Sequence, residues 1–516
     1  MDKEAHTWGF NAYSLIEAAG RSCADTLIRS YPKKFHKRPR ISVFAGTGNN
    51  GADAMVMLRY LILIGLADSS SSELILKRLP DNSDTDPWAE IARSLQKMKV
   101  PVFVWQKDTC LSNLRDILID GISGTGLKGA LKGEAAEMVA AINAHKKNYP
   151  QALVVSIDIP SGCSDEWESG MPIVEADITL AIESQKRCIY SPIARPSAAT
   201  ILAVDGIFPR EIISGCKEIE LIDWKSIQDK VPPVRPDSHK YKRGLVELRC
   251  GSPGTTGAAL IAARGAQAAG AGLIHLVVDD DIYPVAASGA GGIMVSPESK
   301  EKEAFIGKFK PDAILLGPGW GREKDRSIVF EKALSLEKKG WPLILDADAI
   351  ELAKTKVFNA NTIITPHPGE FERFSGIEQK ITQRNPFPVL QEYARRCNAV
   401  IVYKSHVIII AAPDGRLGVV DGMRAGLASG GSGDLLAGFC AAIAARMFVN
   451  SSLDCFTCAA ASAALLIASG SQDSVITRFT DPLELADEAA DLAGKAWLSS
   501  SRGDDDSKCK DHLYGR

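Results

Sequence analysis

Hydrophobic and polar positions alternate along this chain in a repeating order of short apolar runs, glycine turns and helical spacing. Residues 12–30 carry apolar side chains every three to four positions, which predicts an amphipathic helix. Residues 40–45 form a short apolar run that ends in Gly46-Thr-Gly-Asn-Asn-Gly, and a helical run follows at 54–65. A strand, a glycine turn and a helix in this order predict the first unit of a doubly wound α/β sheet.

The same order continues to about residue 204. Strands are predicted at 73–79, 101–105, 116–120, 152–158, 176–181 and 200–204, with helices at 88–98 and 135–145. The carboxyl ends of parallel strands face one crevice, where ligands bind. The glycine and Asp-Pro loops at these ends are therefore the first candidates for a site.

The alternation breaks between residues 223 and 243 and then starts again. Val231-Pro-Pro-Val-Arg-Pro236 cannot continue a helix or a central strand. The sequence predicts a first domain at 1–225, a linker at 226–243, a second domain at 244–502 and a disordered tail at 503–516.

The second half repeats the α/β pattern. Strands are predicted at 244–249, 273–278 and 400–404, and strands with their following loops at 313–321, 342–348 and 362–370. A helix is predicted at 258–269, and a hairpin pairs 407–411 with 417–420. The stretch 427–434 and three helices follow.

Composition and charge exclude several classes of protein. At 516 residues and a net charge of −3, the chain has room for two large domains and no general attraction to nucleic acid. Its start lacks the features of a signal peptide, and no apolar run reaches the roughly 18 residues of a membrane helix. The eleven cysteines are scattered, which favours free thiols in a reducing compartment. We expect a cytoplasmic protein.

The stretch Leu427-Ala-Ser-Gly-Gly-Ser-Gly-Asp434 carries the clearest chemistry. A glycine-rich turn before a helix is an anion site, because free N–H groups and the helix dipole favour negative charge. Asp434 would repel an anion there unless it takes a proton from the group that attacks that anion. This suggests phosphoryl transfer to a hydroxyl. The alternative is an ordinary helix start with Asp434 as the N-cap.

The first half has its own polar constellation. Gly46-Thr-Gly-Asn-Asn-Gly and Gly124-Thr-Gly-Leu-Lys-Gly both fit the dinucleotide pattern of dehydrogenases, but Lys77-Arg78 stands where that class needs an acid. Asn50, Asp120 and Ser161 follow converging strands and offer only oxygen ligands, which suits a hard cation. Asp158 lies at the sharp Ile-Pro-Ser-Gly turn, where it can act as a general acid or base.

Several motifs resemble two known domains. Asn49-Asn-Gly-x-Asp, Asp120-Gly-Ile-Ser-Gly-Thr-Gly and Ser156-Ile-Asp-Ile-Pro-Ser-Gly resemble the NAD(P)H-hydrate epimerase domain, the YjeF N-terminal family. The second half is similar to the ADP/ATP-dependent NAD(P)H-hydrate dehydratase domain; the motifs are Asp237-Ser-His-Lys-Tyr-Lys-Arg-Gly, Gly317-Pro-Gly-Trp-Gly, Leu345-Asp-Ala-Asp, Thr365-Pro-His-Pro-Gly-Glu and Ser429-Gly-Gly-Ser-Gly-Asp434. The resemblance covers about residues 10–500. It implies an α/β protein with an N-terminal Rossmann-like three-layer α/β/α domain followed by a ribokinase-like α/β domain.

The resemblance also implies roles for individual residues. The hydrate site of the epimerase would consist of Asn49, Asn50, Gly51, Ala52, Asp53, Gly124, Thr125, Gly126, Leu127, Lys128, Gly129, Ala130 and the catalytic Asp158. Asn50, Asp120 and Ser161 would hold K⁺. In the dehydratase, Ala258, Gly321, His367 and the catalytic Asp434 would face the hydrate, and Lys404, Ser405, His406, Val407, Ile408 and Gly433 would bind the nucleotide.

The implied substrates are NADHX and NADPHX, the hydrates of NADH and NADPH. ADP is the implied phosphoryl donor, with ATP as the alternative, and Mg²⁺ is expected with Asp346 and Asp348 as candidate ligands. The resemblance further implies a homo-oligomer. From the net charge and the short apolar runs we expect neither a nucleic acid nor a membrane as partner.

The sequence leaves one alternative from another class. The glycine loop is shared with ribokinase-like small-molecule kinases, and the family's Gly-Gly-Asp-Gly is Gly51-Ala-Asp-Ala54 here. If the backbone at Ala52 needs a positive φ, its methyl group would be strained there. The chain would then be a kinase with a non-catalytic N-terminal binding module.

Overall fold

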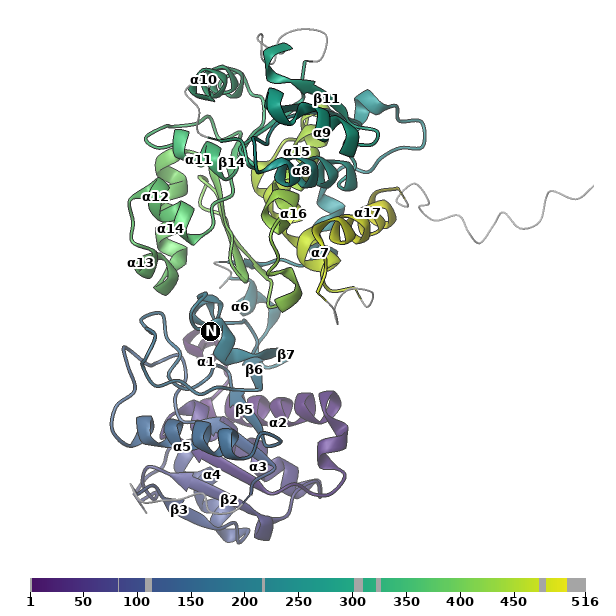
Figure 1. The fold of residues 1–516 in the computed structure, drawn as a ribbon. Coiled ribbons are helices and arrows are strands. Elements are labelled where there is room, and N and C mark those ends of the chain that lie inside the picture. Colours follow the sequence, from purple (N-terminus) through teal and green to yellow (C-terminus); the bar gives the residue numbers. More distant parts are fainter. Residues whose placement is uncertain are drawn as a thin grey trace, which may run out of the picture. The chain divides into compact units, whose positions relative to one another are not determined.

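The computed structural model divides into two compact units, residues 1–218 and 219–516 (Figure 1). It describes residues 2–81, 83–106, 114–215, 219–300, 310–321, 326–472 and 479–498. Each unit is a separate α/β body with its own sheet and core. The predicted tail at 503–516 lies outside the described residues.

The sheet of the first unit has seven strands, all parallel, in the order β3-β2-β1-β4-β5-β6-β7. The strands are β1 Ile41–Ala45, β2 Ser72–Leu76, β3 Val102–Val104, β4 Ile117–Gly121, β5 Leu153–Ile157, β6 Ile178–Ile182 and β7 Thr200–Val204. The order reverses between β1 and β4, which creates a crevice at their carboxyl ends.

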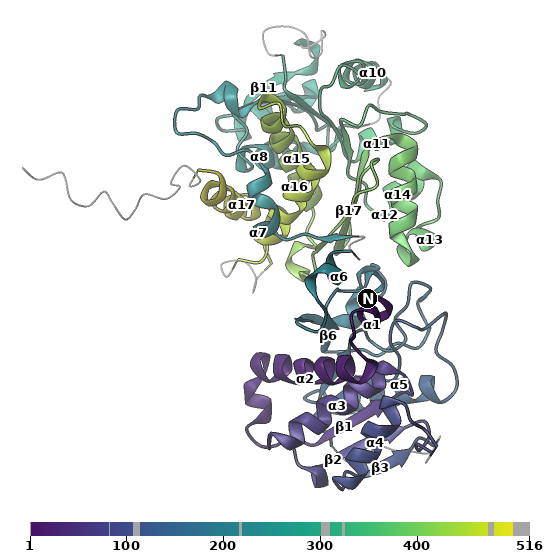
Figure 2. The same cartoon turned by 180° about the vertical axis from the view of Figure 1, so that it is seen from behind.

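Helices cover both faces of this sheet. They are α1 Asp2–Thr7, α2 Ala12–Ser30, α3 Asn49–Leu63, α4 Pro87–Lys97, α5 Glu134–Asn148 and α6 Arg210–Ser214. Val43 and Ile119 share a core with α2, α3 and α4, whereas their neighbours Phe44 and Leu118 share a core with α5. Successive strand residues point to opposite faces, so the predicted three-layer Rossmann-like arrangement is confirmed (Figure 2).

Most predicted elements of this unit form within a few residues of their expected bounds, but α3 begins five residues early. Gly48 is extended (φ −98°, ψ −173°) and precedes the first helical residue, Asn49. The sequence Asn-Asn-Gly favours a loop on its own, and the packed turn makes it the first turn of the helix instead.

The sheet of the second unit has ten strands in the order β11-β10-β9-β12-β13-β14-β15-β16-β17-β8. The strands are β8 Glu220–Leu221, β9 Leu245–Arg249, β10 Leu273–Val278, β11 Met294–Pro297, β12 Ala313–Leu316, β13 Leu343–Leu345, β14 Thr362–Ile364, β15 Val400–Tyr403, β16 Val407–Ala411 and β17 Leu417–Asp421. The run from β11 to β15 is parallel, and β16 and β17 form the predicted antiparallel hairpin. The edge strands β8 and β11 were not predicted.

Two groups of helices cover the sheet of the second unit (Figure 1). The helices of the unit are α7 Trp224–Ile227, α8 Thr256–Ala268, α9 Tyr283–Gly289, α10 Arg326–Glu337, α11 Asp348–Leu352, α12 Pro368–Ser375, α13 Gln379–Arg384, α14 Pro386–Cys397, α15 Ser432–Val449, α16 Cys455–Ser469 and α17 Pro482–Leu498. The alanine-rich α8, α15 and α16 form the main core with one face of the sheet. By length and composition α15 is the one described helix that could cross a membrane, but most of it is buried in this core.

The predicted linker at 226–243 is wrong, and the second unit starts by residue 219. β8 pairs with β17, and the rings of Trp224 and Trp497 lie 5.5 Å apart. Ile227 and Val231 are each 1% exposed. The prolines prevent regular structure, as predicted, but the apolar side chains of Ile227 and Val231 just before them are buried within the second unit.

Candidate active sites

The first unit has a cavity of about 770 Å³ at the carboxyl ends of its strands. Loops after β1, β4 and β5 form one side, and residues of α1 and α2 form another. The predicted residues that line it are Asn49, Asn50, Gly51, Asp53, Gly124, Thr125, Gly126, Leu127 and Asp158.

Four other predicted residues lie elsewhere. Lys128 lines a second cavity of about 440 Å³, which shares Thr125, Leu127 and Lys186 with the first. Gly129 and Ala130 line neither of these two cavities. Ala52 is fully buried.

The buried alanines at 52 and 54 fit the fold. Both lie inside α3, and neither is among the residues with positive φ. Their methyl groups belong to the core that α3 shares with the sheet. The strain that an alanine at position 52 would bring to a left-handed backbone therefore does not arise.

Asp158 is held in an unusual conformation beside a lysine that the sequence did not reveal. Its φ is +65°, in the left-handed region that is rare for aspartate. Its carboxylate accepts hydrogen bonds from Lys186 Nζ at 2.5 Å and from the Ile182 N–H at 3.2 Å. Lys186 also donates to the Ile182 carbonyl at 2.7 Å. The pair lines the cavity and can move a proton or hold a negative charge there.

The structure brings the three predicted cation ligands together. The Ser123 carbonyl accepts hydrogen bonds from the Asn50 amide at 3.0 Å and from the Ser161 hydroxyl at 3.1 Å. Asp120 is fully buried and accepts from the Ser156 hydroxyl at 2.7 Å and the Ser161 N–H at 2.8 Å. Burial raises the pKa of the Asp120 carboxyl, and hydrogen bonds from the serines oppose that shift.

In the second unit, Asp434 lies in the first turn of α15 rather than at its N-cap. The N-cap is Gly431, whose φ is +98°, and Asp434 is the third helical residue. The alternative interpretation of Asp434 as an ordinary N-cap is therefore wrong. Burial raises the pKa of Asp434 to about 7, with further contributions from the charges of Asp346 and Glu370.

Lys404 is the cation of this cluster. Its Nζ donates to Asp346 at 2.5 Å and lies 4.0 Å from Glu370. Burial disfavours the charge on Lys404, but the carboxylates of Asp346, Glu370 and Asp434 together raise its pKa. A Cβ atom on Gly433 would lie 3.3 Å from Lys404 Nζ, so the lysine reaches the first turn of α15.

The other predicted nucleotide residues lie in the turn after β15 and at the start of β16. The Ser405 hydroxyl donates to the Val407 carbonyl at 2.6 Å, and His406 is exposed at the turn. Val407 and Ile408 are buried, so only their backbone groups can reach a nucleotide. Arg424 is exposed and donates to Ser471 at 3.3 Å.

His367 begins α12 near Lys404. Its Nδ1 accepts from the Gly369 N–H at 3.0 Å and the Glu370 N–H at 3.3 Å, and Glu370 accepts from the His367 N–H at 2.8 Å. The imidazole is half exposed, and its Nε2 lies 3.5 Å from Glu370. This capping box fixes the ring and places Glu370 toward Lys404.

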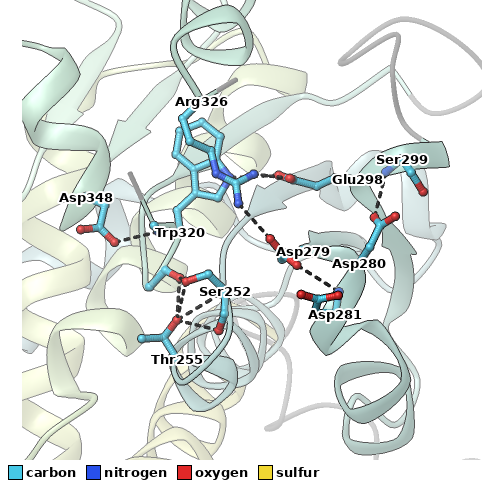
Figure 3. A network of polar contacts seen from close by, with 12 residues as sticks. Ser252, Thr255, Asp279, Asp280, Asp281, Glu298, Ser299, Trp320, Arg326 and Asp348 are labelled. Carbon is cyan, nitrogen blue, oxygen red and sulfur yellow. Dashed lines mark hydrogen bonds and ion pairs between the residues drawn. The ribbon is translucent and has the colours of Figure 1, made fainter. Parts of the chain in front are cut away.

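Figure 3 shows a polar network around Trp320, to which the backbone groups of Gly319 and Gly321 contribute. The Gly319 carbonyl accepts from Thr255 at 2.7 Å and Ser252 at 3.0 Å, and a Cβ on Gly319 would lie 3.1 Å from that of Ala258. The Gly321 N–H donates to Asp348 at 3.0 Å, which links this loop to the start of α11.

The two predicted magnesium ligands, Asp346 and Asp348, have different hydrogen-bond partners. Asp346 is 1% exposed and accepts from Lys404 and from the Thr365 hydroxyl at 2.7 Å. Asp348 accepts from Gly321. Among the described residues, no group of three or more histidine, cysteine or acidic side chains could hold a metal ion.

These features define the class: a two-domain α/β enzyme, with a Rossmann-like crevice and a separate glycine-rich helix start that carries a buried acid. Residues 12–188 match the family described as YjeF-related protein N-terminus. Residues 246–489 match the NAD(P)H-hydrate dehydratase family.

Two relatives match this chain over most of its length and most of their own. The bifunctional NAD(P)H-hydrate repair enzyme Nnr of Synechocystis is 30% identical over 467 residues, which are 85% of this chain and 83% of the relative. The Escherichia coli enzyme of the same name is 26% identical over 471 residues, 89% of this chain and 86% of that one. The solved ADP/ATP-dependent NAD(P)H-hydrate dehydratase from Bacillus subtilis is 25% identical with a TM-score of 0.48, and covers 55% of this chain and 100% of its own. The chain belongs to the family of bifunctional NAD(P)H-hydrate repair enzymes.

Proposed function

We propose that the first unit interconverts the R and S hydrates of NADH and NADPH, and that the second unit dehydrates the S hydrate at the expense of ADP. The observation that carries the proposal is Asp434, a buried carboxyl with a pKa raised to about 7, at a glycine-rich helix start next to Lys404. A base of this kind beside an anion site serves phosphoryl transfer to a hydroxyl group.

Epimerisation uses the nitrogen of the hydrated nicotinamide ring. The hydroxyl at C6 lies next to this nitrogen, whose lone pair expels it and leaves an iminium ion. Water then returns to the other face and inverts the centre. Asp158, paired with Lys186 in the cavity, is the group that moves a proton during these steps.

Dehydration needs a better leaving group than hydroxide. Asp434 takes the proton of the substrate hydroxyl while that oxygen attacks the terminal phosphorus of ADP. The bond from this phosphorus to the bridging oxygen breaks, and AMP leaves. The N–H groups at the start of α15 and the Lys404 ammonium stabilise the negative charge of the transferring phosphoryl group. Phosphate then leaves as C5 loses a proton, which restores the reduced nicotinamide.

We propose K⁺ at Asn50, Asp120 and Ser161. The group offers oxygen ligands around the Ser123 carbonyl, and the buried Asp120 supplies the negative charge that fits a cation. For Asn50 to bind K⁺ through its side-chain oxygen, the amide group would have to rotate by 180°. Such a rotation exchanges the positions of the amide oxygen and nitrogen, which are assigned from hydrogen bonds. When bound, K⁺ would hold the Gly124 loop and the Asp158 loop in register.

Mg²⁺ would enter with the nucleotide, since it usually takes one or two carboxylates and several phosphate or water oxygens. Asp346 is the better candidate ligand, because its contact with Lys404 places it next to the residues proposed to bind the nucleotide. We also propose ADP rather than ATP as the donor, a cytoplasmic location and a homo-oligomer.

The test is one assay on the full chain. Mixed hydrate epimers are incubated with ADP or ATP, with and without K⁺, and the absorbance of reduced nicotinamide and the release of inorganic phosphate are followed. The proposal expects both signals in equal amounts. A stable phosphorylated product without reduced nicotinamide would contradict it and favour a small-molecule kinase.

A further inference from the structure

Among the residues that the structure describes, four titratable side chains line the 770 Å³ cavity of the first unit: His6, Asp53, Asp158 and Lys186. Asp158 and Lys186 form one ion pair at the ends of β5 and β6. Asp53 is only 7% exposed and lies near the N-terminal end of α3. His6 belongs to none of these elements, since it lies in α1, and the mechanism above does not use it.

His6 comes from a different wall of the cavity. It belongs to α1, which precedes α2, and the α2 residues Ala12, Leu15, Ile16 and Ala19 line the cavity beside it. Figures 1 and 2 both show α1 near β6. Asp158 approaches from the strand ends, so the two side chains reach the cavity from separate elements.

The short helix is fixed on both sides of His6. Ala5 is fully buried in the core of the unit, and the N–H groups of Trp8 and Phe10 donate to its carbonyl at 3.0 and 3.1 Å. The Gly9 N–H donates to the His6 carbonyl at 3.1 Å. The imidazole itself is exposed, and it makes no hydrogen bond or ion pair with any residue that the structure describes. It is thus held over the cavity with both nitrogens available.

Inversion at C6 needs proton carriers on two faces of the ring. Hydroxide leaves from one face and must gain a proton, while water adds from the opposite face and must lose one. A side chain at one fixed position, such as Asp158 in the loop after β5, can reach only one face of a bound ring. We propose that His6 is a second catalytic residue of the epimerase, which moves the proton on the face toward α1. This inference rests on the epimerase activity proposed above.

The step balances with water as the only co-reactant. The C6–O bond breaks, its electron pair goes to oxygen, and a proton from one carrier completes the departing water. The nitrogen lone pair forms the C=N bond of the iminium ion. A second water forms a new C6–O bond on the opposite face, the C=N pair returns to nitrogen, and the other carrier takes the excess proton. For the opposite epimer the two residues exchange roles.

The experiment measures epimerisation by the full chain with each pure hydrate epimer, without nucleotide, against a blank for the uncatalysed reaction. His6→Gln and His6→Ala are each expected to lower kcat about 10²-fold, the usual contribution of a general acid or base, with KM within about twofold of wild type. Added imidazole should restore part of the kcat of His6→Ala. His36→Gln is the matched control, because His36 is an exposed histidine of the same unit that lines neither cavity.

Wild-type kcat in either variant overturns the proposal. A rise in KM alone, or a loss of kcat in His6→Ala that imidazole does not restore, assigns His6 a binding or structural role and overturns it as well. A wild-type chain that does not exceed the blank contradicts the epimerase function itself, which separates that failure from a failure of His6.

Discussion

Asp434 and Lys404 carry opposite charges in the same buried surroundings. To act as a base, Asp434 must be ionised, but burial and the charges of Asp346 and Glu370 favour its neutral form. Lys404 remains charged in the same surroundings because three carboxylates face it. The pKa of Asp434, about 7, therefore lies near neutral pH, where a general base with such a pKa is most effective.

The pH dependence of dehydration follows from Asp434. Its pKa of about 7 means that kcat/KM for the S hydrate should fall about tenfold for each pH unit below 7 and level off above it. The measurement is an initial-rate profile from pH 5 to pH 9 at saturating ADP. A profile that is flat between pH 5 and pH 7 would contradict the role of Asp434 as the base.

Asp434 also lowers the stability of the folded chain at neutral pH. Its folded pKa of about 7 lies above the ordinary value of 3.8, so the stability it contributes is complete below pH 3.8 and is lost as the pH rises through 7. Asp434→Asn should therefore match wild type in Tm at pH 4. It should exceed wild type at pH 8 by more than roughly 2–4 °C, the effect of about 1 kcal/mol in a domain of this size, because a pKa raised from 3.8 to about 7 corresponds to about 4 kcal/mol. Thermal scans of both chains at the two pH values decide this, and an Asn variant that is less stable at pH 8 would show that the carboxylate is structurally required.

Individual residues were only partly predictable from the sequence. Asp158 and Asp434 stand in recognisable motifs next to glycines, and the structure places both at strand or helix ends. Lys186 carries no motif signal, because its contact with Asp158 arises only when β6 pairs with β5. His6 lies far from every motif, and only the packing of α1 brings it to the cavity.

At the scale of elements, two glycines set the position of α15. A Cβ on Gly438 would overlap the Ala262 carbonyl of α8, and one on Gly265 of α8 would lie 2.6 Å from the Leu435 carbonyl. The two helices therefore pack backbone to backbone directly behind Asp434. This contact holds the start of α15 at the site.

Gly438→Ala should destabilise the second unit by about 1–3 kcal/mol, because the added methyl group forces α8 and α15 apart. Gly494→Ala in α17 is the matched control, since its methyl group would lie 3.8 Å from a single Leu498 carbon and alanine favours the helix. Denaturant unfolding of both variants measures the difference. Equal stability of Gly438→Ala and wild type would show that the helices are free to separate.

Element positions were largely predictable because most strands are short apolar runs bounded by glycine or proline. The exceptions have physical causes. β8 is two exposed residues that become a strand only by pairing with β17, and α3 begins at Asn49 because the tight turn overrides the local preference of its glycines. The linker was misplaced because a proline-rich sequence indicates irregular backbone, whereas burial depends on Ile227 and Val231.

At the scale of the whole molecule, the chain contains two sites in two compact units with separate cores. Their connection is chemical, since the first unit turns the R hydrate into the S hydrate that the second consumes. The sequence predicted two domains in this order, although it could not show that the boundary precedes β8.

Separate cores predict separate responses to ligand. ADP with Mg²⁺ should raise the transition temperature of the second unit and leave that of the first unchanged. At a hundredfold excess over Kd the ligand adds about 2.7 kcal/mol to the unfolding free energy of the unit that binds it. Gly438→Ala identifies the second transition, because it should lower only that one. Differential scanning calorimetry with and without ADP is the measurement, and an equal shift of every transition would mean that the units unfold as one.

The most direct test of the two-site account is turnover of each pure hydrate epimer by wild type, Asp158→Asn and Asp434→Asn, with ADP present. Wild type should convert both epimers to reduced nicotinamide. Asp434→Asn should release none while it still interconverts R and S. Asp158→Asn should consume the S hydrate at the wild-type rate and the R hydrate only as fast as it epimerises without enzyme. Loss of both activities in a folded Asp434→Asn chain, or R hydrate turnover at the wild-type rate by Asp158→Asn, would contradict the account.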